Sequence, residues 1–381
     1  MNKAALGIDF GVSTTVAALA GEAGSEVVSD AAGETVVPSC VAFTPTGKEI
    51  VGEVAKERRA IDPTNTIHSM KRIIGEPWTS STVKRFIEQY PFFTLEHHDD
   101  GVPRFATRKG LLTSMEMCAK VILHMKRLVE SSGHEAKSAV VGVPSAYDRR
   151  QRTATITAMR KAGFKDAICV GEPIAIAWGI TEEKGRDTRI IAIYDFGGGT
   201  FDLAVCEVRG GGVGLLAEGG DEYLGGDDVD RLLADWIVEQ VLRKHQWDIR
   251  TSPEAMARLV TEAERVKIAL SQSEQEEVNL DAVEESELLV NEKVLVEQSL
   301  LMDLSSDLVR RTFAVCDDVI SRAGIAVADI EEVYLAGGST NLPSIPQAVE
   351  SYFGRQPLVA DRPEHLVALG AAKIALKCDM R

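Results

Sequence analysis

Residues 4–20 of the chain read AALGIDFGVSTTVAALA, and residues 190–208 read IIAIYDFGGGTFDLAVCEV. In both stretches an apolar run ends in Asp-Phe-Gly, and a hydroxyl residue and a second apolar run follow. This order predicts a strand, a tight glycine turn and a second strand. Because the two stretches lie about half a chain apart, they indicate a duplicated lobe in which a hairpin leads each half.

Strands and helices alternate in the rest of the chain, which predicts an α/β architecture. Strands are expected at 137–143 and 167–170, and a helix is expected to start at Pro173 because proline suits the first helical turn. Short alternating runs within 276–297 predict a small antiparallel sheet. Further helices are expected at 113–131, 148–162, 226–246, 253–273, 299–323, 343–353 and 362–377.

The bulk composition is that of a soluble globular protein with two domains of ordinary size. The 381 residues are 45% hydrophobic and 26% charged, which supplies enough apolar side chain for two cores. The net charge of −16 argues against a nucleic-acid partner, because such partners are bound by clustered Lys and Arg. Neither a signal peptide nor an apolar run of membrane-spanning length is present, so we expect a cytoplasmic protein without a membrane partner.

The cysteines are widely scattered and contain no CxxC pair. That spacing suits neither a zinc site nor a compact disulfide framework. We expect small buried thiols where the neighbours are apolar. The cysteines are Cys40, Cys118, Cys169, Cys206, Cys316 and Cys378.

Asp9 and Asp195 each stand at the end of an apolar strand, just before a glycine turn. Gly11 in the first turn and the glycines 197–199 in the second can take positive φ and let backbone amides approach an anion. A carboxylate beside such a turn can hold hydrated Mg²⁺ against phosphates. One copy alone could be an ordinary hairpin. Two copies that face each other across a cleft would clamp a polyphosphate from both sides.

A third glycine pair, Gly337 and Gly338, follows the apolar strand 333–335 and precedes a helix, so it can seat a nucleotide sugar or phosphate against backbone N–H groups. Other familiar nucleotide-binding and metal-binding motifs are absent or do not fit their context. No GxxxxGK[ST] P-loop occurs. The stretch GVGLLA at 212–217 matches a dinucleotide fingerprint but continues as strand-like sequence, so a hairpin turn is expected there. The HHDD stretch at 97–100 is expected to be a solvated loop, because no further ligands stand at metal-site spacing.

Three segments resemble the two phosphate motifs and the adenosine motif of the actin, sugar-kinase and heat-shock superfamily: GIDFGVST at 7–14, DFGGGTFD at 195–202 and GGS at 337–339. Four more resemble the 70-kDa heat-shock chaperones in particular and occur in that family's order: MKRIIG at 70–75, VPSAYD at 143–148, GEPIAIAWG at 171–179 and GDEYLGGDDVD at 220–230. Together they span nearly the whole chain, which is therefore similar to the nucleotide-binding domain of that family.

The resemblance implies an actin-like ATPase fold, with two ribonuclease-H-like lobes that each carry a mixed five-stranded sheet flanked by helices. ATP would lie in the cleft between the lobes. Lobe I would cover residues 1–184, with an outer subdomain at about 37–112, and lobe II residues 185–360, with an outer subdomain at about 226–302. The C-terminal helix, about 361–381, would pack back on lobe I. The polar stretch 182–188 is the expected division between the lobes.

The resemblance also implies roles for matching residues. Asp9 and Asp195 would hold Mg²⁺ through water, with Asp202 as a further carboxylate behind them. Lys71 would position the attacking water, although by itself it would be read as a surface residue beside Arg72. Glu172 would help to orient water and metal, and Thr200 would contact the terminal phosphate. The residues implied around ATP or ADP are Gly11, Val12, Ser13, Thr14, Gly197, Gly198, Gly199, Asp202, Glu264, Lys267, Ser271, Gly337, Gly338, Ser339, Asn341 and Glu364.

Two further sets of residues have a specific implied role. Glu264, Lys267 and Ser271, spaced along one helix, would reach the ribose and adenine, although Glu-x-x-Lys is also a common solvated helical pair. Pro144 and Arg152 resemble the pair that relays the nucleotide state to the other domain of the family.

The chain departs from the family pattern at several positions. Val12 replaces a hydroxyl residue near the γ-phosphate, and Gly171 replaces a common asparagine. Ile268 and Asn341 stand where the family stacks adenine between two arginines, so the cation–π contribution is lost and weaker or less adenine-selective binding is expected. The sequence stops at Arg381, before the Leu-rich linker and the peptide-binding domain of the family, so we expect the nucleotide-binding domain alone.

The function implied is a slow Mg²⁺-dependent ATPase that acts as a conformational switch in protein folding and in the stress response. It would be a monomer, with J-domain co-chaperones, nucleotide-exchange factors and unfolded client proteins as partners. A regulatory or scaffold module that binds nucleotide with little hydrolysis is the alternative, made plausible by Val12. A small-molecule kinase would need a catalytic carboxylate and an acceptor pocket, and Lys71 and Glu172 favour water as the acceptor instead. The segments 171–179 and 220–230 argue against an actin-like filament protein.

Overall fold

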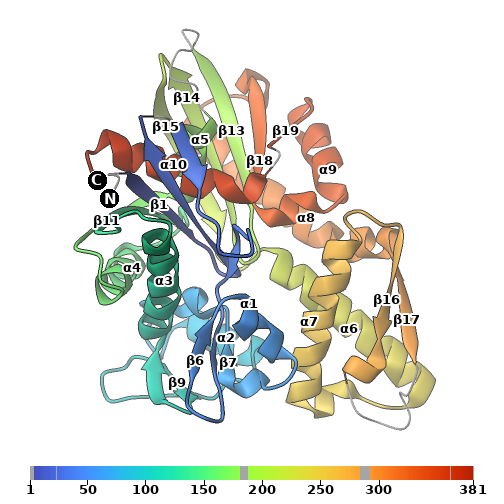
Figure 1. The fold of residues 1–381 in the computed structure, drawn as a ribbon. Coiled ribbons are helices and arrows are strands. Elements are labelled where there is room, and N and C mark those ends of the chain that lie inside the picture. Colours follow the sequence, from blue (N-terminus) through green and yellow to red (C-terminus); the bar gives the residue numbers. More distant parts are fainter. Residues whose placement is uncertain (1–3, 23, 181–187, 284–291, 361, 381) are drawn as a thin grey trace.

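The computed structural model describes all residues except 1–3, 23, 181–187, 284–291, 361 and 381. Two large mixed sheets form its centre (Figure 1). In the first sheet the strand order is β12-β11-β1-β2-β3, and the short β4 pairs with β2. Its strands are β1 (Ala5–Phe10), β2 (Thr14–Gly21), β3 (Gly24–Val27), β4 (Val37–Pro38), β11 (Ser138–Val143) and β12 (Asp166–Gly171).

The second sheet repeats the central arrangement of the first. Its order is β15-β14-β13-β18-β19. The central strand β13 runs antiparallel to β14 and parallel to β18, as β1 runs antiparallel to β2 and parallel to β11. The two hairpins that the sequence predicted therefore occupy equivalent places. The strands are β13 (Arg189–Phe196), β14 (Phe201–Arg209), β15 (Gly212–Asp221), β18 (Glu332–Ala336) and β19 (Leu358–Val359).

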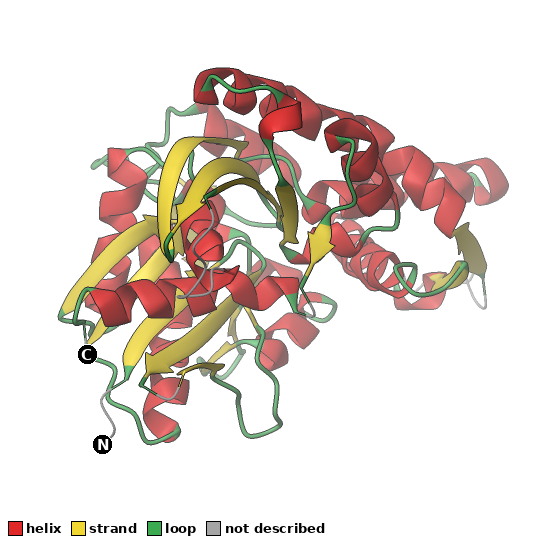
Figure 2. Cartoon of the chain, turned by 90° about the horizontal axis from the view of Figure 1, so that it is seen from above, coloured by secondary structure: helices red, strands yellow, loops and turns green. Residues whose placement is uncertain are grey.

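Two helices rich in small residues lie between these sheets (Figure 2). Helix α10 (Leu366–Lys377) packs on β1, β2 and β11, and α5 (Glu172–Ile180) packs on β13, β14 and β15 as well as on α10. The helices cross so closely that a Cβ added at Gly370 would lie 1.6 Å from the carbonyl oxygen of Ala175. Glycine at this position therefore sets the distance between the two halves of the molecule.

Longer amphipathic helices cover the other faces of the sheets. Helices α3 (Ser114–Ser131) and α4 (Arg149–Lys161) share a core with β1 and β2, and α8 (Gln298–Ala323) shares one with β13 and β14. Helix α9 (Ser344–Phe353) joins the latter core. A capping box at Thr113 and Glu116 starts α3, and another at Asp148 and Gln151 starts α4, which satisfies their first backbone N–H groups.

Each half also carries an outer part made of short elements or a helix pair. In the second half these are α6 (Gly226–His245), α7 (Pro253–Ala269), β16 (Gln275–Asn279) and β17 (Lys293–Glu297). In the first half they are β5 (Val41–Phe43), β6 (Glu49–Val51), α1 (Glu53–Lys56), β7 (Thr66–Ile67), the 3₁₀ turn η3 (Met70–Ile73), α2 (Ser81–Gln89), β8 (Leu95–Glu96), β9 (Arg104–Thr107) and β10 (Gly110–Thr113). None of the helices in the described ranges is both long and apolar enough to cross a membrane.

Most predicted elements are confirmed, and the differences have local causes. The helix predicted at 253–273 ends at Ala269, because the hydroxyl-bearing residues that follow form turns with the last helical carbonyls. The helix predicted at 362–377 opens as a 3₁₀ turn at Pro363–His365 before α10 begins. The first sheet has a sixth strand, β4, beyond the five expected. The expected division between lobes at 182–188 falls almost wholly outside the described residues.

Two smaller strand pairings and the state of the cysteines complete the fold. The predicted sheet within 276–297 is confirmed as the pair β16 and β17. The hairpin expected at 212–217 is present, but its turn lies just before this stretch, at Gly210 and Gly211, and 212–217 is itself part of strand β15, which pairs with β14. All six cysteines are free, and Cys40, Cys118, Cys206 and Cys316 are buried.

The α5–α10 crossing yields a stability prediction. Gly370→Ala should lower the free energy of unfolding by about 3 kcal/mol, because the new methyl group has to push the Ala175 carbonyl away. Gly21→Ala is the matched control: a Cβ there meets nothing within 4 Å, so we expect a change within about 0.5 kcal/mol. Urea unfolding followed by circular dichroism measures both. Equal stability of the two variants would contradict the close crossing.

Candidate active site

The two glycine turns have the same local structure and touch each other. The amide of Gly11 donates to the Thr14 carbonyl at 2.9 Å, and the amide of Gly197 donates to the Thr200 carbonyl at 3.0 Å. A Cβ added at Gly199 would lie 2.7 Å from the Cβ of Val12. Glycine is thus required in the second turn because the first turn packs against it.

Two adjoining cavities contain nearly all the predicted site residues. The inner cavity, of about 70 Å³, lies at the turns, and the outer cavity, of about 610 Å³, opens beside it. The inner cavity is lined by Asp9, Gly11, Val12, Ser13, Thr14, Lys71, Glu172, Asp195, Gly197, Gly198, Gly199, Thr200, Gly337, Gly338, Pro363, Glu364 and Val367. Of the predicted residues the outer cavity has Ser13, Thr14, Gly198, Glu264, Lys267, Ser271, Gly338, Ser339, Asn341 and Glu364.

Lys71 is buried in the inner cavity, so its reading as a surface residue is wrong. It lies in η3, its side chain is 1% exposed, and its Nζ donates to Glu172 Oε1 at 3.0 Å. Glu172 is the first residue of α5. The Nζ also lies 5.6 Å from the ring centroids of Phe10 and Tyr147. These contacts fix the ammonium group in one place at the floor of the site.

Carboxylates outnumber the positive charge around Lys71. Asp9, Glu172, Asp195 and Asp202 are close enough to influence one another's charge. Asp195 and Asp202 are direct cross-strand partners in β13 and β14. Two like charges placed directly opposite each other destabilise a sheet. When its carboxyl groups are ionised, the cluster carries a surplus of negative charge that a cation would neutralise.

The crowding shifts the pKa of each aspartate upward. Burial and the charge of Glu172, partly offset by Lys71, raise the pKa of Asp9 to about 7. Burial and Glu172 raise the pKa of Asp202 to about 8, against the hydrogen bond that it accepts from Ser145. Burial and the neighbouring carboxylates also raise the pKa of Asp195 well above its usual value. Asp202 is the one predicted site residue that lines neither cavity, and it lies behind the turn.

The third glycine element supports the second turn. Gly337 has φ of 80°, and a Cβ there would lie 2.6 Å from Asp195 Oδ1. Ser339 Oγ donates to the Gly197 carbonyl at 2.8 Å. Ser339 therefore stabilises the second turn through its hydroxyl, and it also lines the outer cavity.

The outer cavity brings together the residues predicted to meet the ribose and base. Glu264 accepts from Lys56 at 2.8 Å and from Arg59 at 2.7 Å, which joins α7 to the outer part of the first half. Lys267 pairs with Asp230 at 2.8 Å. Ser271 lies beyond the end of α7, so the expectation that all three lie along one helix is wrong for Ser271. Its turn nevertheless keeps it in the cavity.

The two positions that replace arginines also face this cavity. Ile268 is 57% exposed there, and Asn341 donates its amide to the Gly338 carbonyl at 3.0 Å. Val36 and Leu342 line the same cavity. At these two positions the cavity wall is therefore uncharged, where the family pattern would supply cations.

Some residues of the site were given no role in the sequence analysis. Arg59, Arg72 and Asp227 hold the two halves together beside the cavities, yet charged residues of this kind resemble any solvated surface residue. Arg72 lies within the quoted stretch 70–75 and Asp227 within 220–230, which was the available signal. Arg152 donates to the Tyr147 carbonyl at 3.0 Å and so lies next to the stretch that contains Pro144.

The expected solvated loop at 97–100 is confirmed by the structure. Residues 97–100 are exposed, and Asp100 pairs with Arg104 at 2.6 Å. Within the described ranges no three His, Cys, Asp or Glu side chains converge closely enough to ligate a metal directly.

Comparison with known proteins agrees with this geometry. The family model "Hsp70 protein" matches residues 5–379. The chain is similar to the chaperone protein DnaK of Stenotrophomonas maltophilia (strain R551-3), with 35% identity over 376 residues. That match covers 96% of this chain and 58% of the relative, so the chain spans less than two thirds of the relative's length. From a family match over nearly its whole length, we conclude that this chain belongs to the Hsp70 protein family.

Proposed function

We propose that this chain is the part of an Hsp70 chaperone that binds ATP and hydrolyses it slowly with Mg²⁺, and that it acts as a nucleotide-controlled switch in protein folding. The observation that carries the proposal is the buried Lys71–Glu172 pair, which lies among aspartates at the point where two glycine turns meet. Phosphoryl transfer to water needs positioning and charge neutralisation more than covalent chemistry. This arrangement offers both.

The inner cavity is the proposed phosphate site. Backbone amides of the turns at 11–14 and 197–200 would face the phosphates, and the Thr200 hydroxyl would contact the terminal one. Lys71 would hold the attacking water, and Glu172 keeps Lys71 in place. The donor set of oxygen ligands with surplus negative charge fits Mg²⁺, which usually keeps several waters. Asp9 and Asp195 would hold that ion through water, and the ion would offset phosphate charge during transfer.

The outer cavity is the proposed nucleoside site. Its volume of about 610 Å³ lies within the usual range of small-molecule sites. Glu264, Lys267 and Ser271 would face the ribose and base from one side, and Ser339, Asn341 and Glu364 would close the other. The Lys56 and Arg59 contacts of Glu264 would then link nucleoside binding to the closing of the two halves.

A module that binds nucleotide with little hydrolysis is the second candidate. The observation in its favour is Val12, whose side chain is 7% exposed and packs against Gly199 where the two turns meet. An aliphatic side chain there offers no hydrogen bond to a phosphate or to water.

Further expectations complete the proposal. We propose lobes at 1–184 and 185–360, with outer subdomains at about 37–112 and 226–302 and the helix 361–381 packed on lobe I. In the cell we propose a cytoplasmic monomer that serves protein folding and the stress response. Its partners would be a J-domain co-chaperone, a nucleotide-exchange factor and unfolded clients, with neither nucleic acid nor membrane among them.

Lys71→Ala tests the hydrolytic role directly. Single-turnover hydrolysis of bound ATP should fall about a hundredfold or more, because a preorganised positive charge is lost at the phosphate. Affinity for ADP should change by less than about threefold. Lys126→Ala removes a lysine that donates to the Gly163 carbonyl outside both cavities, and it should hydrolyse at the wild-type rate. Tight ATP binding without hydrolysis in the wild type would instead favour the second candidate.

The raised pKa values yield a pH prediction. Since the pKa of Asp9 is about 7 and that of Asp202 about 8, part of the cluster is protonated at neutral pH. Binding of ADP with Mg²⁺ favours the charged carboxylates and should release about one proton near pH 7. The affinity for ADP with Mg²⁺ should rise with pH until both groups are ionised, at about pH 8 to 9. Calorimetry in buffers of different ionisation enthalpy measures the release.

The control for this titration is Asp9→Asn, which should release fewer protons because one titrating group is gone. ADP with a chelator in place of Mg²⁺ should also release fewer. Proton uptake by the wild type on Mg²⁺–ADP binding would refute the assignment of a cation to this cluster.

Restoring the arginines tests base recognition. The double variant Ile268→Arg, Asn341→Arg should bind ADP about tenfold more tightly, because each cation–π contact contributes about 0.5–1 kcal/mol at an exposed site. The ADP to GDP affinity ratio should rise as well. Ile268→Leu with Asn341→Gln is the matched control without added charge. Wild-type binding that already prefers ADP over GDP strongly would contradict the expected weak selectivity.

A further inference from the structure

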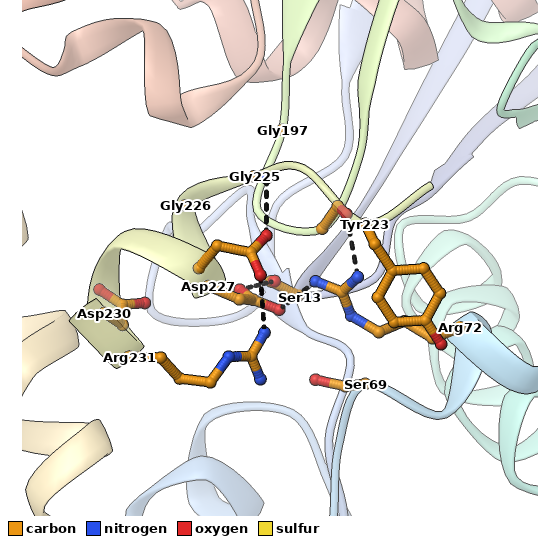
Figure 3. A network of polar contacts seen from close by, with 12 residues as sticks. Ser13, Ser69, Arg72, Gly197, Tyr223, Gly225, Gly226, Asp227, Asp230 and Arg231 are labelled. Carbon is orange, nitrogen blue, oxygen red and sulfur yellow. Dashed lines mark hydrogen bonds and ion pairs between the residues drawn. The ribbon is translucent and has the colours of Figure 1, made fainter. Parts of the chain in front are cut away.

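The guanidinium of Arg72 reaches from the first half of the molecule into the second, directly beside the glycine turns (Figure 3). Its side chain is fully buried. Nη1 donates to the carbonyls of Gly199 and Glu222, both at 3.0 Å, and Nη2 donates to Asp227 Oδ2 at 3.2 Å. One side chain thus holds the second turn, the end of β15 and the start of α6.

Asp227 extends this contact to the first turn. Its Oδ1 accepts from Ser13 Oγ at 2.9 Å, and its amide donates to the Gly198 carbonyl at 2.7 Å (Figure 3). The carboxylate of Asp227 therefore bridges Arg72 and Ser13. Through these two residues both turns are tied to η3, the element that carries Lys71.

Tyr223 holds the guanidinium in this orientation. Its ring lies 4.9 Å from the Arg72 guanidinium and 4.2 Å from that of Arg85. The Tyr223 hydroxyl donates to the Thr82 carbonyl in α2 at 3.1 Å. The ring thus belongs to the second half of the molecule, whereas Arg72, Arg85 and Thr82 belong to the first.

These contacts exist only while the two halves are together. The acceptors of Arg72 lie in the second half, so a separation would break all three hydrogen bonds of the guanidinium and replace them by contacts with water. Arg72 and Lys71 are neighbours in the same short turn, so the tie that Arg72 makes to Gly199 also sets how Lys71 faces the second turn. A planar group with a fixed fork of donors is suited to this task, and a flexible ammonium is not.

We propose that Arg72 is a positioning residue for ATP hydrolysis, which orders the second glycine turn against Lys71 when the two halves close. This inference rests on the proposed ATPase function. Arg72 lines neither the inner nor the outer cavity, so it acts through Gly199, Asp227 and Ser13 and does not touch the phosphates.

The experiment compares Arg72→Met and Arg72→Lys with wild type, with Arg85→Met as the matched control. Arg85→Met removes the other guanidinium on Tyr223 and leaves the contacts to Gly199 and Asp227 intact. Single-turnover hydrolysis at saturating ATP should fall about ten- to a hundredfold in Arg72→Met, the effect of losing hydrogen bonds to a charged group. ADP affinity should change by less than about threefold. Arg72→Lys should remain slow, and Arg85→Met should match wild type.

A second readout does not depend on hydrolysis. Amide hydrogen exchange of the segment 197–203 in the ADP-bound protein should be faster in Arg72→Met than in wild type or Arg85→Met, with the strand 138–143 unchanged. If wild type hydrolyses no ATP, the proposed function fails, but the exchange of 197–203 still decides the role of Arg72. Thermal unfolding identifies a variant that does not fold, and Asp227→Asn, which keeps the acceptor for Ser13 but loses the charge, then takes its place.

Two outcomes would overturn the proposal. In the first, Arg72→Met keeps the wild-type hydrolysis rate and the wild-type exchange of 197–203. In the second, Arg72→Lys restores both, which would show that only a positive charge is needed at this place.

Discussion

The close crossing of α5 and α10 is the contact on which the rest of the structure depends. Gly370 and Ala175 bring the two helix backbones together with no room for a further methyl group. Since α10 packs on the first sheet and α5 on the second, this crossing sets how the hairpins β1–β2 and β13–β14 face each other. The first residue of α5 is Glu172, so the same helix that joins the sheets also delivers a carboxylate to the site.

Charge is distributed unevenly in the site that Glu172 of α5 enters. Lys71 is buried and held by Glu172, whereas Asp9, Asp195 and Asp202 have raised pKa values because burial and mutual repulsion disfavour their charged forms. A protein would gain little stability from such a cluster in isolation. The arrangement supports the proposed site for a cation and a polyphosphate, because their arrival would satisfy groups that folding has desolvated.

Among the described residues, the outer parts of the two halves meet through ionic contacts, and their buried apolar clusters are separate. Lys56 and Arg59 share Glu264 above the outer cavity, and Arg72 pairs with Asp227 beside the inner one. For Glu264 the two basic partners outweigh the effect of burial and hold its pKa below the usual value. Contacts of this kind are directional, so they fix one relative placement of the halves and are lost when the halves separate. They thus suit a switch better than an apolar interface would.

Local sequence was sufficient for the secondary structure and for the glycine turns, since strand alternation, helix periodicity and turn residues act over a few neighbouring positions. The equivalence of β1 and β13 could be predicted from two matching stretches. The predicted helix end beyond Ala269 failed because helix ends depend on a few weak local hydrogen bonds. The ribose-side residues were placed by resemblance to a family, as Glu-x-x-Lys alone is indistinguishable from a solvated pair.

What the sequence by itself determined is therefore the order of elements, the two phosphate-type turns and the acidic residues beside them. Only the tertiary structure decided that Lys71 is buried, that Ser339 braces the second turn, and that Arg72 and Asp227 connect both turns. Each of these depends on partners more than 100 positions away along the chain. The charge and burial of a lysine or arginine are set by such distant partners, and no pattern of neighbouring residues encodes them.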